Sequence, residues 1–255
     1  MSAELPDGDP SAIVTRFVPS PNHGERRGGA RPDLLLLHYT GMPTADEALR
    51  RLCDPAAEVS AHYLVMEDGA VIQLVPEDRR AHHAGVSSWA GETDINSRSV
   101  GIEIVNPGHA GGLPPYPDVQ IAAVTRLAQA IVEHWGIPAE RVLGHSDVAP
   151  GRKEDPGERF PWDRLAVAGI GLWAEPLPVT EDVVLRPGDH GPAVQVVQDA
   201  LAFYGYGIEA TGAYDDATRL VVAAFQRHFR PARVDGILDS STLGTLQNLV
   251  GLRTD

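Results

Sequence analysis

The chain combines several patterns of apolar residues, and each predicts a different element of secondary structure. The run 34–37, four leucines followed by His38, is typical of a strand buried on both faces. Segments rich in β-forming residues predict further strands over 12–18, 62–66, 70–75, 99–105 and 141–144, and a Glu-Asp-Gly turn joins the second and third as a hairpin. Apolar residues at helical spacing predict a helix from Pro117 to Trp135, and a Thr-x-x-Glu capping signal at Thr44 predicts a short helix ending near Cys53. Together these elements indicate an α/β fold with a mixed central β-sheet flanked by helices.

The pattern changes after Trp162, where Gly-rich turns separate three short amphipathic segments. These segments, at 192–203, 215–228 and 240–250, predict a small C-terminal three-helix domain. Two turn sequences within it are alike, 212–215 followed by Thr218 and 235–239 followed by Thr242, which indicates an internal duplication. We therefore divide the chain into an N-terminal arm (1–30), a first domain (31–173), a Pro-containing linker (174–184) and a helical domain (185–255). The linker favours a helical domain that is independent of the first and carries no chemistry of its own.

Composition excludes several classes of protein. The 255 residues include 35 acidic and 21 basic side chains, and the net charge of −14 opposes binding to nucleic acid. The only cysteine, Cys53, excludes both an intramolecular disulfide framework and a Cys-rich zinc finger. No apolar run approaches the ~18 residues of a membrane span, so no transmembrane segment is expected. The N-terminus has neither a basic segment nor an apolar one, which favours a cytoplasmic protein.

Two histidines stand where predicted strands end, and this position favours a functional site. His38 closes the leucine run, and His145 follows the strand 141–144 and begins the loop that contains Asp155. A zinc hydrolase needs three ligands of the histidine and carboxylate type and one open position for water, which these three residues would supply. The spacing alone leaves the alternative open that the histidines are ordinary core or surface residues.

Glu103 is a second candidate because it lies in an otherwise apolar strand. It stands between Ile102 and Ile104, and carboxylates are seldom buried unless they are paired or functional. Such a group is suited to act as a general base beside a metal ion. The alternative is a salt bridge to Arg98 or Arg126.

Several motifs occur in an order that resembles one family, the zinc-dependent N-acetylmuramoyl-L-alanine amidases of the type 2 amidase family, relatives of the peptidoglycan recognition proteins. The matching segments lie between about residues 30 and 165: 37–41 (LHYTG), 59–65 (VSAHYLV), 68–75 (DGAVIQLV), 83–87 (HAGVS) with Trp89, 96–104 (NSRSVGIEI), Gly144-His145, and 153–157 (KEDPG). The chain departs at His82, where relatives commonly have tryptophan. The resemblance implies hydrolysis of the amide bond between N-acetylmuramic acid, or its anhydro form, and L-alanine of peptidoglycan stem peptides.

The same resemblance implies roles for individual residues. His38, His145 and Asp155 would bind one zinc ion, with Glu103 as general base and Lys153 as oxyanion stabiliser. Lys153 is the only lysine beside 20 arginines, and a compact ammonium differs from the planar guanidinium in the contacts it makes.

The candidate substrate contacts are His83, Trp89 and Asn96, and for the last two a packing role is the alternative. His82 is placed with His83 along the cleft, and His62 in the core behind it.

The C-terminal segment resembles the peptidoglycan-binding-domain-1 module on the segments 185–191 (LRPGDHG), 204–207 (YGYG), Phe225-Gln226 and 234–236 (VDG). Its alternative is a helical domain that only packs on the first. The implied partner is peptidoglycan or a muropeptide. A wall-binding module makes a periplasmic location the alternative to a cytoplasmic one. Two other functions stay open for the whole chain, a non-catalytic recognition protein and a zinc peptidase that cuts within the stem peptide.

Overall fold

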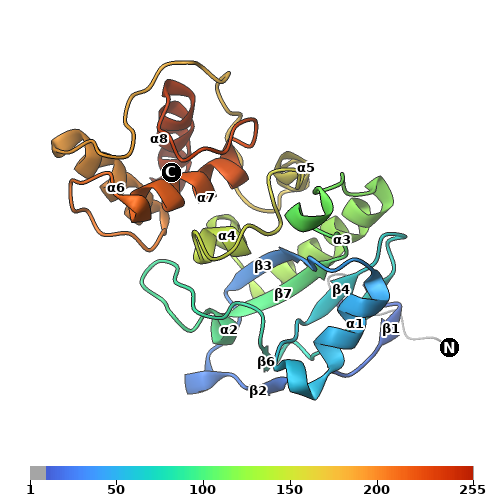
Figure 1. Ribbon diagram of the computed structural model, residues 1–255. Coiled ribbons are helices and arrows are strands. Elements are labelled where there is room, and N and C mark those ends of the chain that lie inside the picture. The colour runs from blue at the N-terminus through green and yellow to red at the C-terminus, as the bar shows by residue number, and fades with distance from the viewer. Residues whose placement is uncertain (1–9, 255) are drawn as a thin grey trace.

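The first domain is built on a six-stranded mixed sheet, as predicted (Figure 1). The computed structural model describes residues 10–254. The strand order is β1-β5-β4-β7-β3-β8, and every neighbouring pair is parallel except β4 and β5, which form the predicted hairpin. The strands are β1 (Arg16–Phe17), β3 (Leu34–Tyr39), β4 (Tyr63–Val65), β5 (Val71–Gln73), β7 (Ser99–Ile104) and β8 (Val142–Gly144). A separate two-stranded sheet pairs β2 (His23–Glu25) with β6 (Arg79–Ala81).

Helices cover both faces of the six-stranded sheet (Figure 1). The long helix α3 (Asp118–Trp135) packs on the face formed by Leu35, Leu37 and Ile102. On the other face α1 (Ala45–Cys53) packs against β4 and β5, and Thr44 caps it as predicted by accepting the Glu47 N–H. The shorter helices of this domain are α2 (Ile95–Arg98), α4 (His145–Val148) and α5 (Trp162–Val167).

The sequence prediction of a strand over 12–18 was too long. Residues Pro10–Ile13 form a 3-10 turn, and only Arg16–Phe17 pairs with β5. The alternation predicted for 99–105 is confirmed, because Ile102 faces α3 while Val105 packs with the cluster around α1. Glu103 therefore lies on the face opposite α3.

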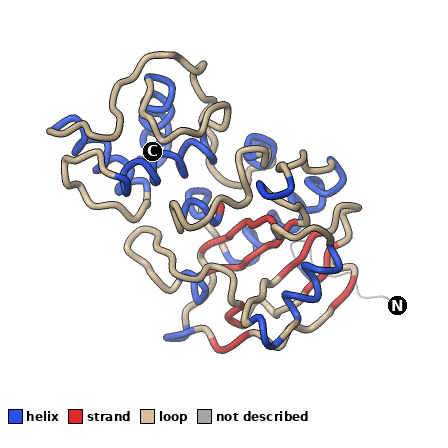
Figure 2. Tube along the Cα trace, in the orientation of Figure 1, coloured by secondary structure: helices blue, strands red, loops and turns tan. Residues whose placement is uncertain are grey.

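The C-terminal module contains three helices, α6 (Pro192–Tyr204), α7 (Asp216–Phe229) and α8 (Ser240–Thr254), and Figure 2 shows helices and loops in this part of the molecule. The predicted duplication is visible in its hydrogen bonds. The Gln198 amide accepts the Gly212 N–H at 2.8 Å and donates to the Thr218 hydroxyl at 2.8 Å. The Gln226 amide accepts the Gly236 N–H at 2.8 Å and donates to the Thr242 hydroxyl at 3.2 Å.

One buried hydrophobic cluster extends across both the module and the first domain. Leu143 and Val148 of the first domain belong to the same buried cluster as Tyr206 and Phe225 of the module. Trp89 is 1% exposed and lies edge-on to Tyr206, with ring centroids 5.0 Å apart. The two parts are thus packed into one unit. Among the described residues, none of the helices combines the length and the hydropathy that a membrane span requires.

Candidate metal centre and active site

The parallel pairing of three strands brings the candidate residues to one edge of the sheet. In the ladder between β3 and β7, His38 is the direct partner of Glu103, so both side chains point to the same face. Strand β8 lies on the other side of β3, and His145 follows it at the start of α4. The carboxyl ends of parallel strands are where α/β sheets form their sites.

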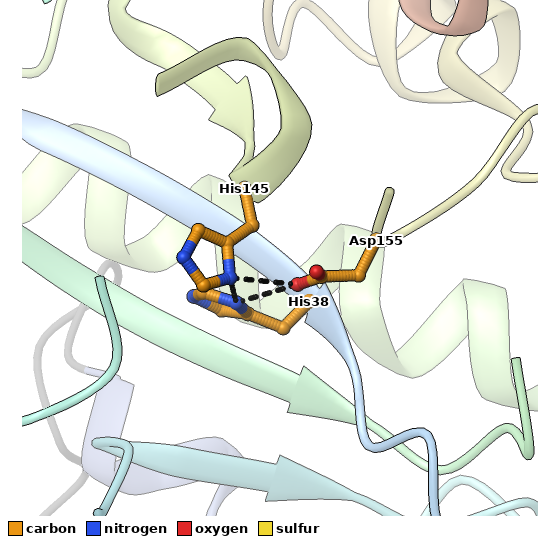
Figure 3. Close-up of side chains that lie close together, drawn as sticks. All are labelled: His38, His145 and Asp155. Atoms are coloured by element: carbon orange, nitrogen blue, oxygen red, sulfur yellow. Dashed lines mark hydrogen bonds and ion pairs between the residues drawn. The ribbon is translucent and has the colours of Figure 1, made fainter. Parts of the chain in front are cut away.

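Three side chains converge there on a single point (Figure 3). Nδ1 of His38 lies 2.9 Å from Nδ1 of His145, and Oδ2 of Asp155 lies 2.8 Å from the first and 3.0 Å from the second. All three residues are buried, and they form a group able to hold a metal ion. The residues predicted as ligands are therefore brought together, although 107 positions separate the two histidines.

Hydrogen bonds on the outer side of the histidines assign their protons. Nε2 of His145 lies 2.9 Å from the Ala84 carbonyl and must carry a hydrogen to bond to it. Nε2 of His38 lies 3.0 Å from Nδ1 of His83, whose Nε2 lies 3.3 Å from the Ser99 hydroxyl. Because Ser99 donates its own hydrogen to the Ile95 carbonyl at 2.7 Å, it accepts from His83, and His83 in turn accepts from His38.

This proton assignment is what a metal ion requires. With both Nε2 atoms protonated, the two Nδ1 atoms and the Asp155 oxygen are three acceptors that face one another, and they attract a cation. Tetrahedral zinc at its usual bond lengths would place such ligand atoms ~3.3 Å apart. The separations of 2.8–3.0 Å are within ~0.5 Å of this value, so small side-chain movements fit the ion.

The charge states of the ligands agree with metal binding. Burial, followed by the neighbouring His145, lowers the pKa of His38 to about 4, so its imidazole is neutral at pH 7. Neutral imidazole and ionised carboxylate are the forms that ligate metals.

Glu103 lies beside the candidate ligands and forms no ion pair within residues 10–254. Burial, and after it the charge of Asp155, raise the pKa of Glu103 well above its ordinary value, and Lys153 opposes the effect. Its Oε2 is buried without a hydrogen-bond partner among the described residues. The salt-bridge alternative is wrong, because Arg98 pairs with Asp33 and Glu92, and Arg126 is exposed on α3, across the sheet.

A cavity of about 370 Å³ opens above these groups. Its lining includes Glu103, Lys153, His145 and Asp155, together with Tyr39 from the end of β3. Lys153 is partly buried. The carboxylate of the neighbouring Glu154 lies 3.4 Å from the guanidinium of Arg227 in the module. Lys153 therefore lies where its ammonium can meet a substrate in the cavity.

The three candidate substrate contacts differ in position. His83 borders the cavity, but its ring is mainly a support behind His38. Asn96 accepts the N–H groups of His83 and Ala84 at 3.0 and 2.8 Å, so it holds the backbone beneath that ring. Trp89 packs against the module, which corresponds to the packing alternative. Neither Asn96 nor Trp89 is among the described residues that line the cavity.

Two further residues support the centre and did not stand out in the sequence. Ser99 ends the hydrogen-bond chain that begins at His38. In an alternating strand, residues separated by an even number of positions lie on one face, and this spacing of Ser99 and Glu103 is the sequence signal that could have found Ser99. Arg152 donates to the Ala84 carbonyl at 2.6 Å, the same carbonyl that receives the His145 proton. His62 lies in the core, as predicted, and its Nδ1 accepts the Gly101 N–H at 2.9 Å.

Comparison with known proteins identifies relatives of both parts of the chain. The family model for N-acetylmuramoyl-L-alanine amidase matches residues 28–158, and the model for a peptidoglycan binding domain matches residues 190–246. The chain is 37% identical over 233 residues to the N-acetylmuramoyl-L-alanine amidase AmiD of Escherichia coli (strain K12), which covers 86% of this chain and 83% of that protein. It is 36% identical over 170 residues to the 1,6-anhydro-N-acetylmuramyl-L-alanine amidase AmpD of Enterobacter cloacae, covering 60% and 89%.

The fold of this chain is similar to solved structures over most of its own length and of theirs. The complex of E. coli AmiD with anhydro-N-acetylmuramic acid-L-Ala-D-gamma-Glu-L-Lys has a TM-score of 0.73 at 34% identity and covers 91% of this chain and 98% of that chain. AmpDh3 from Pseudomonas aeruginosa, in complex with anhydromuramic pentapeptide, has a TM-score of 0.73 at 33% identity and covers 89% and 94%. The similarity therefore extends across both the sheet domain and the helical module.

Proposed function

The chain belongs to the N-acetylmuramoyl-L-alanine amidase family, and from this we propose that it hydrolyses the amide bond between N-acetylmuramic acid, or its anhydro form, and L-alanine of stem peptides. The observation that carries the proposal is the cavity lined by Glu103, Lys153 and two members of the convergent set, His145 and Asp155. His38, the third member, contacts both of these from behind the cavity lining. The relatives AmiD and AmpDh3 were crystallised with anhydromuropeptides, which supports muropeptides as substrates here.

We infer that His38, His145 and Asp155 hold one zinc ion. Two imidazole nitrogens and one carboxylate oxygen are a donor set typical of catalytic zinc, and the ligands leave the cavity side open. When bound, zinc supplies Lewis acidity, which polarises a carbonyl and lowers the pKa of water toward ~7.

The chain's own residues then handle the proton and the developing charge. Glu103, whose pKa is raised by burial, accepts a proton from the attacking water at its unpaired Oε2. It then delivers that proton to the leaving L-alanine nitrogen. Lys153 donates a hydrogen bond to the oxygen that becomes negative as the carbonyl carbon turns tetrahedral. His83 and the Ala84 carbonyl keep the imidazoles of His38 and His145 in the tautomer that ligates.

Two measurements test the proposal on the purified full-length chain. Turnover of anhydro-N-acetylmuramyl tripeptide should disappear after chelation and return with zinc, and mass spectrometry should show the intact peptide with a free L-alanine amine. Fragments cut within the peptide would identify a stem-peptide peptidase instead. Full turnover by protein shown to be metal-free by elemental analysis would refute the zinc mechanism. The predicted cytoplasmic location stays a prediction, which cell fractionation tests.

A further inference from the structure

The helical module contacts the loop that carries the candidate ligands. Residues 144–158, referred to below as the ligand loop, contain His145, Lys153 and Asp155. Figure 1 shows α7 of the module beside α4, which begins this loop. A side chain at Gly151 would lie 2.6 Å from Leu220 of α7, so the helix packs directly on the loop backbone.

Asp147 of α4 is the centre of this contact. It is 0% exposed, and its carboxylate receives three hydrogen bonds. Oδ2 accepts the Gly144 N–H at 2.8 Å and Nδ1–H of His228 at 2.7 Å, and Oδ1 accepts the Tyr206 hydroxyl at 2.7 Å. Two of the three donors come from the module. A buried carboxylate is costly unless its donors are complete, so the module stabilises this conformation of α4.

The donors themselves are held in place. The imidazole of His228 is stacked between Trp162 of the first domain, at 3.7 Å between ring centroids, and Phe229, at 3.8 Å. The module also reaches the far end of the ligand loop, where Arg227 lies 3.4 Å from Glu154 and 3.8 Å from Glu158. The loop is thus fixed near both ends by one helix.

We propose that His228 and Tyr206 are positioning residues for the metal centre, and that the module is a structural part of the catalytic unit. Asp147 lies two residues after His145 on the same helical turn, so any shift of its carboxylate moves the imidazole relative to His38 and Asp155. This proposal rests on the proposed function, because its test measures the affinity for zinc. It replaces the expectation, based on the linker, of a module independent of the chemistry.

The test removes the two donors while keeping the rings. Tyr206→Phe and His228→Phe, singly and together, retain the aromatic packing but leave Asp147 with the Gly144 N–H. In the full-length double variant we expect zinc affinity and kcat on a soluble muropeptide to fall about 10- to 100-fold, with little change in KM. His228→Asn, whose amide nitrogen lies close to the position of Nδ1, should restore part of both. Tyr214→Phe is the control, because it removes one buried hydrogen bond within the module, to the Gly236 carbonyl at 2.9 Å.

The outcomes separate this inference from the proposed function. Parental zinc affinity and kcat in the double variant would overturn the inference while leaving the amidase assignment intact. A parent chain that neither binds zinc nor cleaves muropeptide would instead refute the proposed function. If the double variant does not fold, the single variants decide, since a merely structural role would lower the unfolding temperature of each without changing the zinc affinity of the folded protein.

Discussion

A methyl group added at Gly101 would test the support behind His38. Gly101 lies on β7 two residues before Glu103, on the same face of the sheet. The Cβ of an alanine there would lie 2.6 Å from both Cε1 and Nδ1 of His83 and 2.7 Å from its Cγ. The absence of a side chain at Gly101 is therefore what allows the His83 ring to reach His38.

The size of the effect follows from these distances. Carbon atoms pack at ~3.5 Å or more, so the ring must retreat by ~0.9 Å. Nδ1 of His83 is 3.0 Å from Nε2 of His38, and such a shift takes the pair beyond hydrogen-bond range. We expect the strain to reduce the free energy of unfolding by ~1–3 kcal/mol. Loss of the outer partner should weaken zinc binding by ~10- to 100-fold.

The assay is competition for zinc against a chromogenic chelator, combined with thermal unfolding of the metal-free protein. Gly24→Ala is the matched control, because Gly24 also lies in a strand and its added Cβ meets no atom within 4 Å. In a His83→Ala background, Gly101→Ala should weaken zinc binding little further. A folded Gly101→Ala protein with parental zinc affinity would refute the role given to His83.

Three more predictions concern single side chains. Because burial raises the pKa of Glu103 above the 4.5 of a free side chain, the stability of the metal-free fold falls as the pH rises from 4.5 toward this raised pKa. Glu103→Gln should abolish turnover, and in chemical denaturation it should stabilise the metal-free fold increasingly as the pH rises above 4.5. Lys153→Ala should lower kcat by ~10²–10³ with unchanged zinc content, and it should move the acidic limb of the kcat/KM profile to higher pH because Lys153 lowers the pKa of Glu103. Lys153→Arg should restore little of the rate, and near-parental rates in both variants would contradict the role given to Lys153. Asn96→Ala should reduce the free energy of unfolding by ~1–3 kcal/mol, because the N–H groups of His83 and Ala84 lose their acceptor, whereas Asn96→Asp keeps an acceptor oxygen. Equal melting temperatures in the parent and the two variants would argue against this supporting role of Asn96.

The sequence was sufficient to predict the elements that depend on local patterns. The leucine run and the alternation over 99–105 predicted two buried strands and the face of Glu103, because periodicity is a property of neighbouring residues. That the two strands are adjacent is shown by the structure. The rule that α/β sheets place their sites at strand ends selected His38 and His145 as candidates. Asp155 was proposed as a carboxylate in the loop that follows His145 and was supported by the family resemblance, since a loop residue has no periodicity that places it.

Contacts between the two domains could not be predicted in the same way. Trp89 was equally compatible with a cleft and with packing, because its partner Tyr206 lies far along the chain. The bond from His228 to Asp147 spans 81 positions, and neither residue belongs to a motif that distinguished it. The orientation of His83 depends on the empty space at Gly101, which is visible only once the strand register is known.

The pairing of His38 with Glu103 makes the distance between the proposed ligand and the proposed base a property of the backbone. Neighbouring strands lie ~4.8 Å apart because of the length of the peptide hydrogen bond, which no side-chain substitution changes. A slip of β3 by one residue would move Leu37 out of the core beneath α3 and His38 into it, and a slip of β7 would do the same to Ile102 and Glu103. The apolar side chains that face α3 therefore fix the spacing between His38 and Glu103. Single-residue insertions in β3 or β7 should be tolerated far less than insertions in the loops that shape the cavity.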